Sequence, residues 1–361
     1  MNILLLNAFH SGSHQTWAES IQKYSQHNVE ILSLKGKYWK WRMHGAAISF
    51  AEQLRGETRK DIDLVLCTDM LDLNTFKSLT SKLLPNAVYA IYFHENQITY
   101  PWKANSSDVQ HQRDMHYAFM NYSSALGADK VYFNSRFHQE AFIEELGPFL
   151  KSYPDERNLH LVDSIAAKSE TLYLGNDLKY FDQFERESTT KPCFVWNHRH
   201  EHDKNPEEHF QALEALAKAG QDFDLIVLGE SFANEPEVFG EAKAKLKGNI
   251  VHWGYANSRK EYAALLKRAS HILVTSNHDF FGQSLVEAAY AGAFPILPNR
   301  LVYPEHFTKQ EALFYSEDDN LVEVLKSCIA RQSTDNQRLL RYDWSQMIDE
   351  YDEAFSVLIH T

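Results

Sequence analysis

The chain has 361 residues, a length that suits two domains of ordinary size, and its hydrophobic content of 44% supports real cores. A formal net charge of −13 argues against a generally basic nucleic-acid coat, without excluding a local basic face. The three cysteines form neither a metal pattern nor a disulfide framework, which predicts a reducing compartment. No signal-peptide pattern opens the chain and no apolar run is long enough to span a bilayer, so we expect a cytoplasmic protein without a membrane partner.

Short apolar runs alternate with helical patterns through the first half of the chain. Residues 2–7 predict a strand, a loop with Gly12 follows, and a helix runs to residue 24. Further strands are expected at 29–34, 63–67, 87–93 and 130–133. This alternation is typical of a doubly wound parallel sheet, whose ligands bind at the carboxyl ends of the strands. Gly12 would let the backbone approach a ligand closely, although a plain strand–helix turn is the simpler explanation of one glycine.

Residues 35–42, which we call the basic aromatic segment, hold four basic residues and three aromatic residues in eight positions. Such a mixture suits stacking on bases together with contact to phosphates. The alternative is a solvated loop whose tryptophan side chains pack on their own domain. The candidate nucleic-acid contacts are Lys37, Trp39, Lys40, Trp41 and Arg42.

A dense set of hydrogen-bonding side chains follows the strand at 87–93. It comprises His94, Glu95, Asn96, Gln97 and Tyr100. One histidine is more often structural than catalytic, but this one comes where the sheet presents its ligands. Farther along, a helix is expected at 115–126, and Ser135 is placed to cap the next helix.

A polar run at 182–191 lacks periodicity and predicts a linker, so we place a domain boundary near residue 180. The strand expected at 192–196 ends in a run that contains Arg199 and Lys204. Three alternating histidines lie in the same run, but no cysteine or acid completes a metal site at standard spacing, so we expect no bound metal.

The pattern at residues 272–297 predicts a strand at 272–274, a loop, a helix that Gly292 ends, and a strand at 294–297. The helix begins at Gly282 and Gln283, and its amide groups would attract phosphate at the strand ends. Asp279 and Glu287 flank that point with seven residues between them. Glu287 lies about one turn from Gln283 and suits the hydroxyls of a ribose or sugar. The plain alternative is a surface acid and a helix-dipole acid.

The Asp279-x7-Glu287 pattern, followed by Ala-Ala-Tyr-Ala-Gly, resembles the E-x7-E signature of retaining GT-B glycosyltransferases, with Asp in place of the first Glu. A narrower resemblance is to the tRNA-queuosine α-mannosyltransferase family. It rests on Ser-His-Gln-x-Trp at 13–17, Trp-Lys-Trp-Arg-Met at 39–43, residues 92–101 and His-Asp-Phe-Phe-Gly at 278–282.

This resemblance implies an α/β GT-B fold, with two Rossmann-like doubly wound domains and a cleft between them. It places the acceptor (tRNA) domain at 1–180, the nucleotide-sugar donor domain at 181–342, and a helix at 343–361 that crosses back to the first domain. The implied reaction is transfer of mannose from GDP-mannose to queuosine in the tRNA anticodon, with retention of configuration and no metal requirement.

The resemblance also implies a role for each candidate residue. The catalytic group comprises His94, Asp279, Arg199 and Lys204, with Asp279 and His94 facing the transferred sugar. The donor contacts are Gly12, Arg199, Lys204, Tyr255, Gly282, Gln283 and Glu287; a core aromatic is the alternative for Tyr255. The acceptor contacts are Glu95, Asn96, Gln97 and Tyr100, with Lys37, Trp39, Lys40, Trp41 and Arg42 on the tRNA.

Two other functions remain as alternatives. A GT-B enzyme moving another hexose onto a small molecule or glycan agrees with the net charge of −13, but the basic aromatic segment opposes it. A non-catalytic tRNA- or nucleotide-binding module is permitted by Asp at position 279, but the joint presence of Arg199, Lys204 and Glu287 opposes it. The residues leave the donor base open between guanine and uracil, and the sugar open among common hexoses.

Overall fold

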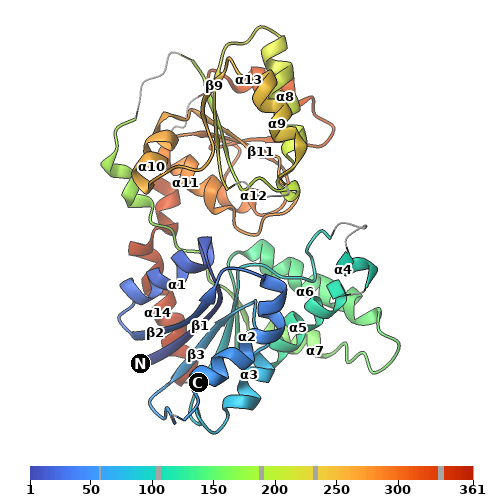
Figure 1. Ribbon diagram of the computed structural model, residues 1–361, viewed down its shortest axis with the longest axis vertical. Coiled ribbons are helices and arrows are strands. Elements are labelled where there is room, and N and C mark those ends of the chain that lie inside the picture. The colour runs from blue at the N-terminus through green and yellow to red at the C-terminus, as the bar shows by residue number, and fades with distance from the viewer. Residues whose placement is uncertain are drawn as a thin grey trace. The chain divides into compact units, whose positions relative to one another are not determined.

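The computed structural model describes residues 1–56, 58–102, 107–111, 113–186, 191–230, 235–331 and 337–360. They form two units, Met1–Gly175 with Trp344–Thr361, and Asn176–Asp343 (Figure 1). Each unit contains one six-stranded parallel sheet with helices around it, so the predicted α/β class is confirmed. The division falls five residues before the predicted boundary at residue 180.

The first unit has the strand order β2-β1-β3-β4-β5-β6. Its strands are β1 (Asn2–His10), β2 (Asn28–Lys35), β3 (Leu64–Thr68), β4 (Val88–Phe93), β5 (Lys130–Phe133) and β6 (Ser169–Thr171). Its helices are α1 (Gly12–Tyr24), α2 (Trp39–Gln53), α3 (Leu73–Thr80), α4 (Ser107–Gln110), α5 (Arg113–Gly127), α6 (Arg136–Lys151), α7 (Leu161–Ala167) and α14 (Trp344–His360). The order reverses between β1 and β3, which makes their carboxyl ends the expected ligand edge.

Alternating side chains of the first sheet bury both of its faces. Leu4, Cys67 and Phe93 belong to a core shared with α2, α3, α5 and α6. On the opposite face, the Trp17 indole donates to the Tyr351 hydroxyl over 3.0 Å, and Tyr351 donates to the Tyr92 hydroxyl over 3.0 Å. Figure 1 shows α14, in red, beside α1, in dark blue. The last helix is therefore part of the first unit.

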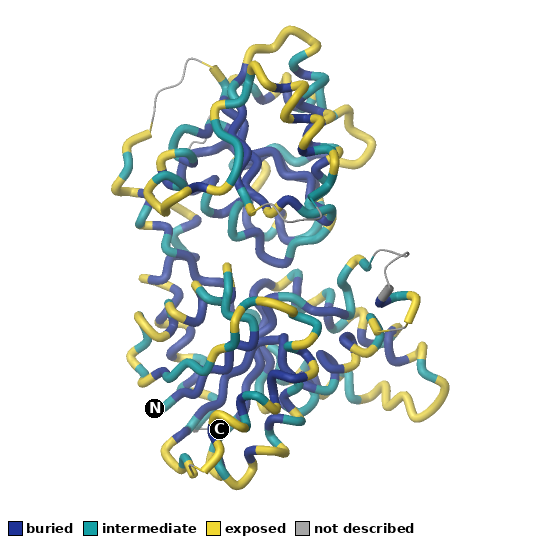
Figure 2. Tube along the Cα trace, in the orientation of Figure 1, coloured by how far each residue is buried: buried dark blue, intermediate teal, exposed yellow. Residues whose placement is uncertain are grey.

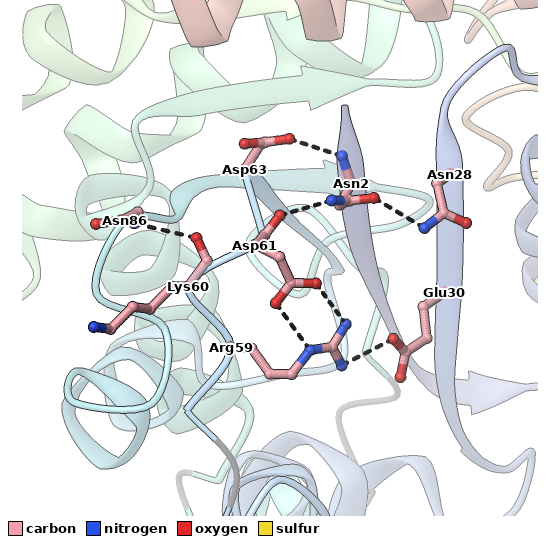
Figure 3. A network of polar contacts seen from close by, with 8 residues as sticks. All are labelled: Asn2, Asn28, Glu30, Arg59, Lys60, Asp61, Asp63 and Asn86. Atoms are coloured by element: carbon pink, nitrogen blue, oxygen red, sulfur yellow. Dashed lines mark hydrogen bonds and ion pairs between the residues drawn. The ribbon is translucent and has the colours of Figure 1, made fainter.

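The amino ends of β1, β2 and β3 are tied together by a polar network (Figure 3). The Asn2 amide donates to Asp63 over 2.8 Å. The Arg59 guanidinium lies 3.0 Å from Glu30 and 3.2 Å from Asp61. These groups satisfy one another, so this end of the sheet is held in register by protein contacts alone.

The second unit has the strand order β12-β11-β10-β7-β8-β9. Its strands are β7 (Cys193–Asn197), β8 (Asp224–Leu228), β9 (Ile250–Trp253), β10 (His271–Leu273), β11 (Phe294–Pro298) and β12 (Leu313–Tyr315). Its helices are α8 (Pro206–Lys218), α9 (Glu237–Lys245), α10 (Arg259–Arg268), α11 (Gln283–Ala291), α12 (Tyr303–His306) and α13 (Leu321–Cys328), with 3-10 turns η1 (Leu178–Gln183), η2 (His202–Lys204) and η3 (Gln337–Tyr342).

The second sheet is fully buried along its central strands, as the dark tube in Figure 2 shows. Phe194, Trp196 and Val227 pack against α8, α9 and α13. The strand order reverses between β7 and β10, which pair directly. Ligands of such sheets bind at the carboxyl ends of the strands flanking this reversal. The loops that follow these two strands carry residues that the sequence analysis selected.

Several local predictions are confirmed and two boundaries differ. Ser135 caps α6 by accepting from the His138 amide over 3.0 Å, and Gly292 ends α11 in a left-handed conformation. The basic aromatic segment is only partly a loop, because α2 begins at Trp39. The last helix begins at Trp344 rather than 343. Across the described ranges, no helix is long and apolar enough to cross a membrane.

Candidate active site

The loops after β7 and β10 are bonded to each other at the carboxyl edge of the second sheet. The Asn277 amide donates to the Asp203 carbonyl over 2.8 Å, and the Thr275 hydroxyl donates to the Lys204 carbonyl over 3.0 Å. The residues predicted to hold the donor phosphates and sugar lie on these two loops and on the start of α11. The structure therefore brings Arg199, Lys204, Asp279, Gly282, Gln283 and Glu287 to one edge of one sheet.

Lys204 is a fixed cation on this edge. Its ammonium donates to the His278 carbonyl over 2.7 Å and lies 3.2 Å from the Asp203 carboxylate, and its side chain is only 12% exposed. Burial lowers the pKa of Lys204, but the Asp279 and Asp203 carboxylates more than offset this, so the pKa is raised. Arg199 pairs with Glu201 at 3.1 Å and keeps a solvent-exposed side chain.

Asp279 shapes the turn that starts α11. One carboxylate oxygen accepts from the Gly282 amide over 2.9 Å, and the other accepts from the Tyr303 hydroxyl over 3.3 Å. Gly282 has φ +73°, a left-handed conformation that favours glycine. The sequence predicted that the amides of Gly282 and Gln283 contact phosphate. The Gly282 amide already donates to Asp279, so the Gln283 amide is the one that could do so without breaking that bond. No side chain caps α11 among the described residues.

Glu287 is held by an aromatic hydroxyl. The Tyr262 hydroxyl donates to one Glu287 carboxylate oxygen over 2.6 Å, and the Asn197 side-chain amide donates to the Tyr262 hydroxyl over 2.8 Å. Burial raises the pKa of Glu287, and the hydrogen bond from Tyr262 opposes that rise only in part. Glu287 is therefore oriented from one side and half-buried, as a carboxylate that receives ligand hydroxyls would be.

The side chains of the alternating histidines His198 and His200 contact different partners and do not meet at one point. His198 is hydrogen-bonded through Nδ1 to the Ser284 hydroxyl at 3.0 Å, whereas His200 contacts Glu235 and stacks on Phe239. Burial, followed by the nearby Lys204 charge, lowers the pKa of His198 to about 4. No group of three or more His, Cys, Asp or Glu residues is placed to hold a metal within the described part of the chain.

The buried side chain of His306 contacts the turn that precedes α11. His306 Nε2 lies 2.6 Å from the Phe281 carbonyl, and its Nδ1 lies 2.8 Å from the Tyr342 hydroxyl. Burial lowers the pKa of His306, so the ring is neutral and can donate through one nitrogen while accepting through the other. This arrangement fixes the carbonyl that directly precedes Gly282.

His94 directly follows β4 at the carboxyl edge of the first sheet. Its amide donates to the Asp69 carboxylate over 2.9 Å, and its carbonyl accepts from the Asn134 side chain over 2.9 Å. The ring centroid lies 4.1 Å from that of His14 and 4.8 Å from that of Trp17. Burial lowers the pKa of His94 well below its usual value, so the ring is neutral. Its Nε2 atom is buried and has no hydrogen-bond partner in the described ranges.

The residues after His94 divide into two groups. The Asn96 carboxamide oxygen accepts from the amides of Ile98 and Thr99, so Asn96 holds the turn. The Gln97 side-chain amide donates to Glu95 over 3.3 Å, while the buried Gln97 Oε1 has no partner that the described chain supplies. Tyr100 lines a hollow of about 350 Å³ with Ile98, Thr99, Ala141, Glu144 and Glu145. Glu95, Gln97 and Tyr100 are thus better placed than Asn96 to contact a ligand.

The basic aromatic segment is also divided. Trp39 packs near Trp102 and Tyr117, and Lys40 forms an ion pair with the buried Asp108. Arg42 donates to the Lys35 carbonyl over 3.2 Å.

Lys37 and Trp41 remain exposed. Trp39 and Lys40 therefore fit the alternative of packing on their own domain, whereas the exposure of Lys37 and Trp41 is compatible with either explanation. Among the remaining predicted contacts, Gly12 is exposed with φ +52°, and Tyr255 is exposed beyond β9, so it is not a core aromatic.

Comparison with known proteins decides the family. Residues 2–176 match the family described as tRNA-queuosine alpha-mannosyltransferase N-terminal, and residues 179–342 match glycosyl transferases group 1. The chain is 33% identical over 319 residues to the tRNA-queuosine alpha-mannosyltransferase of Drosophila melanogaster, covering 86% of this chain and 82% of the relative. This chain belongs to the tRNA-queuosine alpha-mannosyltransferase family. The resemblance found in the sequence is confirmed, and the protein is a glycosyltransferase.

Solved structures agree on the fold of this family member. A glycosyltransferase from Rickettsia africae has a TM-score of 0.69 at 16% identity, covering 99% of this chain and 98% of that one. The Anabaena protein HepE, solved in complex with UDP, has a TM-score of 0.68 at 15% identity, covering 99% of this chain and 100% of that one. Identity this low shows the fold alone, and it confirms the predicted GT-B architecture.

Sequence reasoning missed several residues that orient this family member's candidate site. Asp69 directly follows β3 and Asn197 ends β7, so the strand-end rule that selected His94 could have found them. Tyr262 and Tyr303 lie within helices and carry no local signal. His306 shares that difficulty, because only the fold brings it to the Phe281 carbonyl.

Proposed function

We propose that this protein transfers mannose from GDP-mannose to queuosine in tRNA, with retention of the anomeric configuration and without a metal requirement. Family membership supports the mannosyl group and the tRNA acceptor. The single observation that carries the mechanism is the meeting of a buried lysine, an accessible arginine and an oriented glutamate at the strand-order reversal of the second sheet. That combination suits a nucleoside diphosphate bonded to a sugar.

The diphosphate gains negative charge as its bond to the sugar breaks. We infer that Lys204 and Arg199 stabilise that charge, because Lys204 is already held in place and needs no rearrangement during the reaction. The Gln283 amide at the start of α11 adds a hydrogen-bond donor and the positive end of the helix dipole. Gly282 would contribute its amide only by exchanging its bond to Asp279.

The ribose and the transferred sugar carry hydroxyl groups that carboxylates can bind. Tyr262 occupies one oxygen of Glu287 and orients the group, and we assign the carboxylate to the ribose hydroxyls. We assign Asp279, which also holds the turn before α11, to the hydroxyls of the sugar. Tyr255 is the proposed contact to the base, and the exposed turn at Gly12 is a further proposed donor contact.

His94 offers a neutral ring to the reaction. A retaining glycosyl transfer passes through a state with positive charge on the sugar ring, which a protonated histidine would oppose. Burial keeps His94 uncharged, and its buried Nε2 can pair with a sugar hydroxyl. We infer that the leaving phosphate takes the acceptor proton, so His94 serves as a hydrogen-bonding group and not as a base.

The first unit supplies the proposed acceptor contacts. Glu95, Gln97 and Tyr100 follow His94 at the carboxyl edge of β4, and Asn96 keeps their turn in shape. The proposed tRNA contacts are the exposed Lys37 and Trp41, with Trp39, Lys40 and Arg42 behind them. The three cysteines are buried as thiols and not joined in disulfides, which agrees with the reducing cytoplasm where we propose that the enzyme works.

Mass spectrometry of tRNA nucleosides tests the proposal. Purified protein is incubated with queuosine-containing tRNA and GDP-mannose, and the nucleosides are compared with those from a reaction containing UDP-glucose. We expect queuosine to gain one hexose with GDP-mannose but not with UDP-glucose, and Lys204→Ala to slow that gain by about 10²–10³-fold. A hexose gained only from UDP-glucose would overturn the donor. No gain with either donor, while GDP-mannose still binds in calorimetry, would overturn the acceptor.

A further inference from the structure

Two aromatic side chains stand exposed at the start of α2. Tyr38, the residue before the helix, is 77% exposed, and Trp41 in the first turn is 62% exposed. Large aromatic residues usually bury much of their area, because each contributes strongly to cores and interfaces. Their neighbour Trp39 follows that rule by packing on Trp102 and Tyr117. The exposure of Tyr38 and Trp41 is therefore specific to their positions in this segment.

The Trp41 indole rests on a glycine one turn farther along the helix. A Cβ atom added at Gly45 would lie 2.9 Å from both Cε2 and Cζ2 of Trp41, closer than such atoms approach in proteins. Gly45 does not have a positive φ, so its backbone does not require glycine. Glycine in a helix interior is destabilising by about 0.5–1 kcal/mol relative to alanine. At this position, the absence of a Cβ atom leaves room for the Trp41 ring to lie against the helix.

Charge around the two rings identifies a partner. Lys35 and Lys37 are exposed beside them in a chain of formal net charge −13. Lys40 and Arg42 instead contact Asp108 and the Lys35 carbonyl, so Lys35 and Lys37 are the exposed lysines nearest in sequence to the two rings. An aromatic face with adjacent lysines is how proteins bind unstacked bases of single-stranded nucleic acid.

We propose that Trp41, seated on Gly45 and flanked by Tyr38, is a stacking platform for an unpaired base of the tRNA substrate. Gly45 is then a positioning residue that acts through Trp41, and Tyr38 adds a second ring. This inference rests on the proposed function, because it takes tRNA as the acceptor. It adds that recognition includes a base stacked on α2, outside the segment that follows His94.

A double-mutant cycle in the full chain tests the platform. Binding of queuosine-containing tRNA is measured at fixed salt for the wild type, Trp41→Ala, Gly45→Ala and the double variant. We expect Trp41→Ala to weaken binding about tenfold or more and Trp41→Phe to recover part of the loss. Gly45→Ala should weaken binding while keeping or raising the melting temperature. The double variant should bind no more weakly than Trp41→Ala, because Gly45 acts through the ring.

Ile48→Ala is the matched control, because Ile48 is an exposed apolar residue on the same helix and carries no ring. We expect it to bind tRNA as the wild type does. Wild-type binding by Trp41→Ala, or equal losses from Ile48→Ala and Trp41→Ala, would overturn the stacking platform while the proposed function stands. A wild-type protein that binds no tRNA would instead overturn the proposed function, and the platform with it.

Discussion

The carboxyl edges of the two sheets differ in the charge of the candidate residues that they present. On the second sheet, the charged Lys204 lies against the Asp203 carboxylate and the His278 carbonyl, and Glu287 accepts from Tyr262. On the first sheet, the candidate residues His94 and Gln97 are neutral, and each has a buried polar atom without a partner in the part of the chain that the structure describes, as His198 and Ser276 also have on the second sheet. At the amino end of the first sheet, by contrast, polar side chains bond to one another, as Asn2 does with Asp63 and Arg59 with Glu30 (Figure 3).

This difference corresponds to the charge of the two proposed ligands. A buried ammonium cannot wait unpaired for a diphosphate, because an isolated charge in a protein interior is very unfavourable. An unpaired neutral atom costs about 1–3 kcal/mol, which a folded unit can bear until a ligand completes the bond. The second edge is therefore prepared for a charged donor, and the first edge for hydroxyl and amide groups.

Lys204→Ala carries the largest expected effect. Removing a fixed cation that faces a developing negative charge should lower kcat/KM by about 10²–10³. Lys191→Ala is the matched control, because that lysine forms an exposed ion pair with Asp222 and should leave the rate unchanged. Steady-state kinetics with GDP-mannose measures both. Equal rates for the two variants would show that Lys204 does not act as a fixed cation for the donor at the edge of the second sheet.

His94→Ala should lower kcat by about 10²-fold through loss of a hydrogen bond made as the sugar is transferred. GDP affinity, measured by calorimetry, should stay unchanged because the cations proposed to hold the nucleotide lie in the second unit. A parallel loss of GDP affinity would mean that His94 supports the donor phosphates. Because the His94 ring is neutral, the wild-type rate should show no histidine titration between pH 6 and 8.

His306→Phe tests whether the hydrogen bond between His306 and the Phe281 carbonyl is needed to position the turn before α11. We expect the KM for GDP-mannose to rise about tenfold with a smaller change in kcat, because the Phe281 carbonyl loses its donor and Gly282 moves. His306→Gln, which keeps a donor at that end of the side chain, should recover part of the loss. A rise confined to kcat, with KM unchanged, would contradict a role in donor positioning.

The pH dependence of donor binding should report Glu287. Burial raises its pKa, so it takes up a proton at a higher pH than an ordinary glutamate as the solution is acidified. The protonated group accepts hydrogen bonds from ribose hydroxyls less well, and donor affinity should fall several-fold as the pH decreases through that pKa. Glu287→Gln should bind more weakly and flatten this dependence. An acid loss that persists in Glu287→Gln would assign it to another group.

The smallest effect concerns salt. Lys37→Ala should reduce the slope of log affinity for tRNA against log salt concentration by about 0.7–0.9, because one exposed phosphate contact is lost. Lys40→Ala should change that slope less, since Asp108 already compensates the Lys40 charge. Filter binding over a range of salt concentrations measures both. A larger change from Lys40→Ala would mean that the ion pair opens when tRNA binds.

Local pattern was sufficient for much of this molecule. The apolar runs at residues 272–274 and 294–297 predicted β10 and β11, and the glycine at 292 predicted the end of α11. The sequence could not predict bonds between elements. Asp69 and His94, Tyr262 and Glu287, and Phe281 and His306 are each 25 residues apart. The division of the basic aromatic segment also depends on tertiary contacts, since Asp108 and Trp102 lie outside it.

The route of the chain has a consequence for its synthesis. Trp17 and Tyr351, which share a hydrogen bond, are 334 residues apart, so a ribosome makes α1 long before α14. The face of the first sheet that carries Tyr92 therefore stays uncovered until the second unit has been synthesised and α14 has followed it. A premature stop codon before Trp344 would spare every strand of the sheet that carries Lys204. It would nevertheless leave the half that carries His94 unfinished.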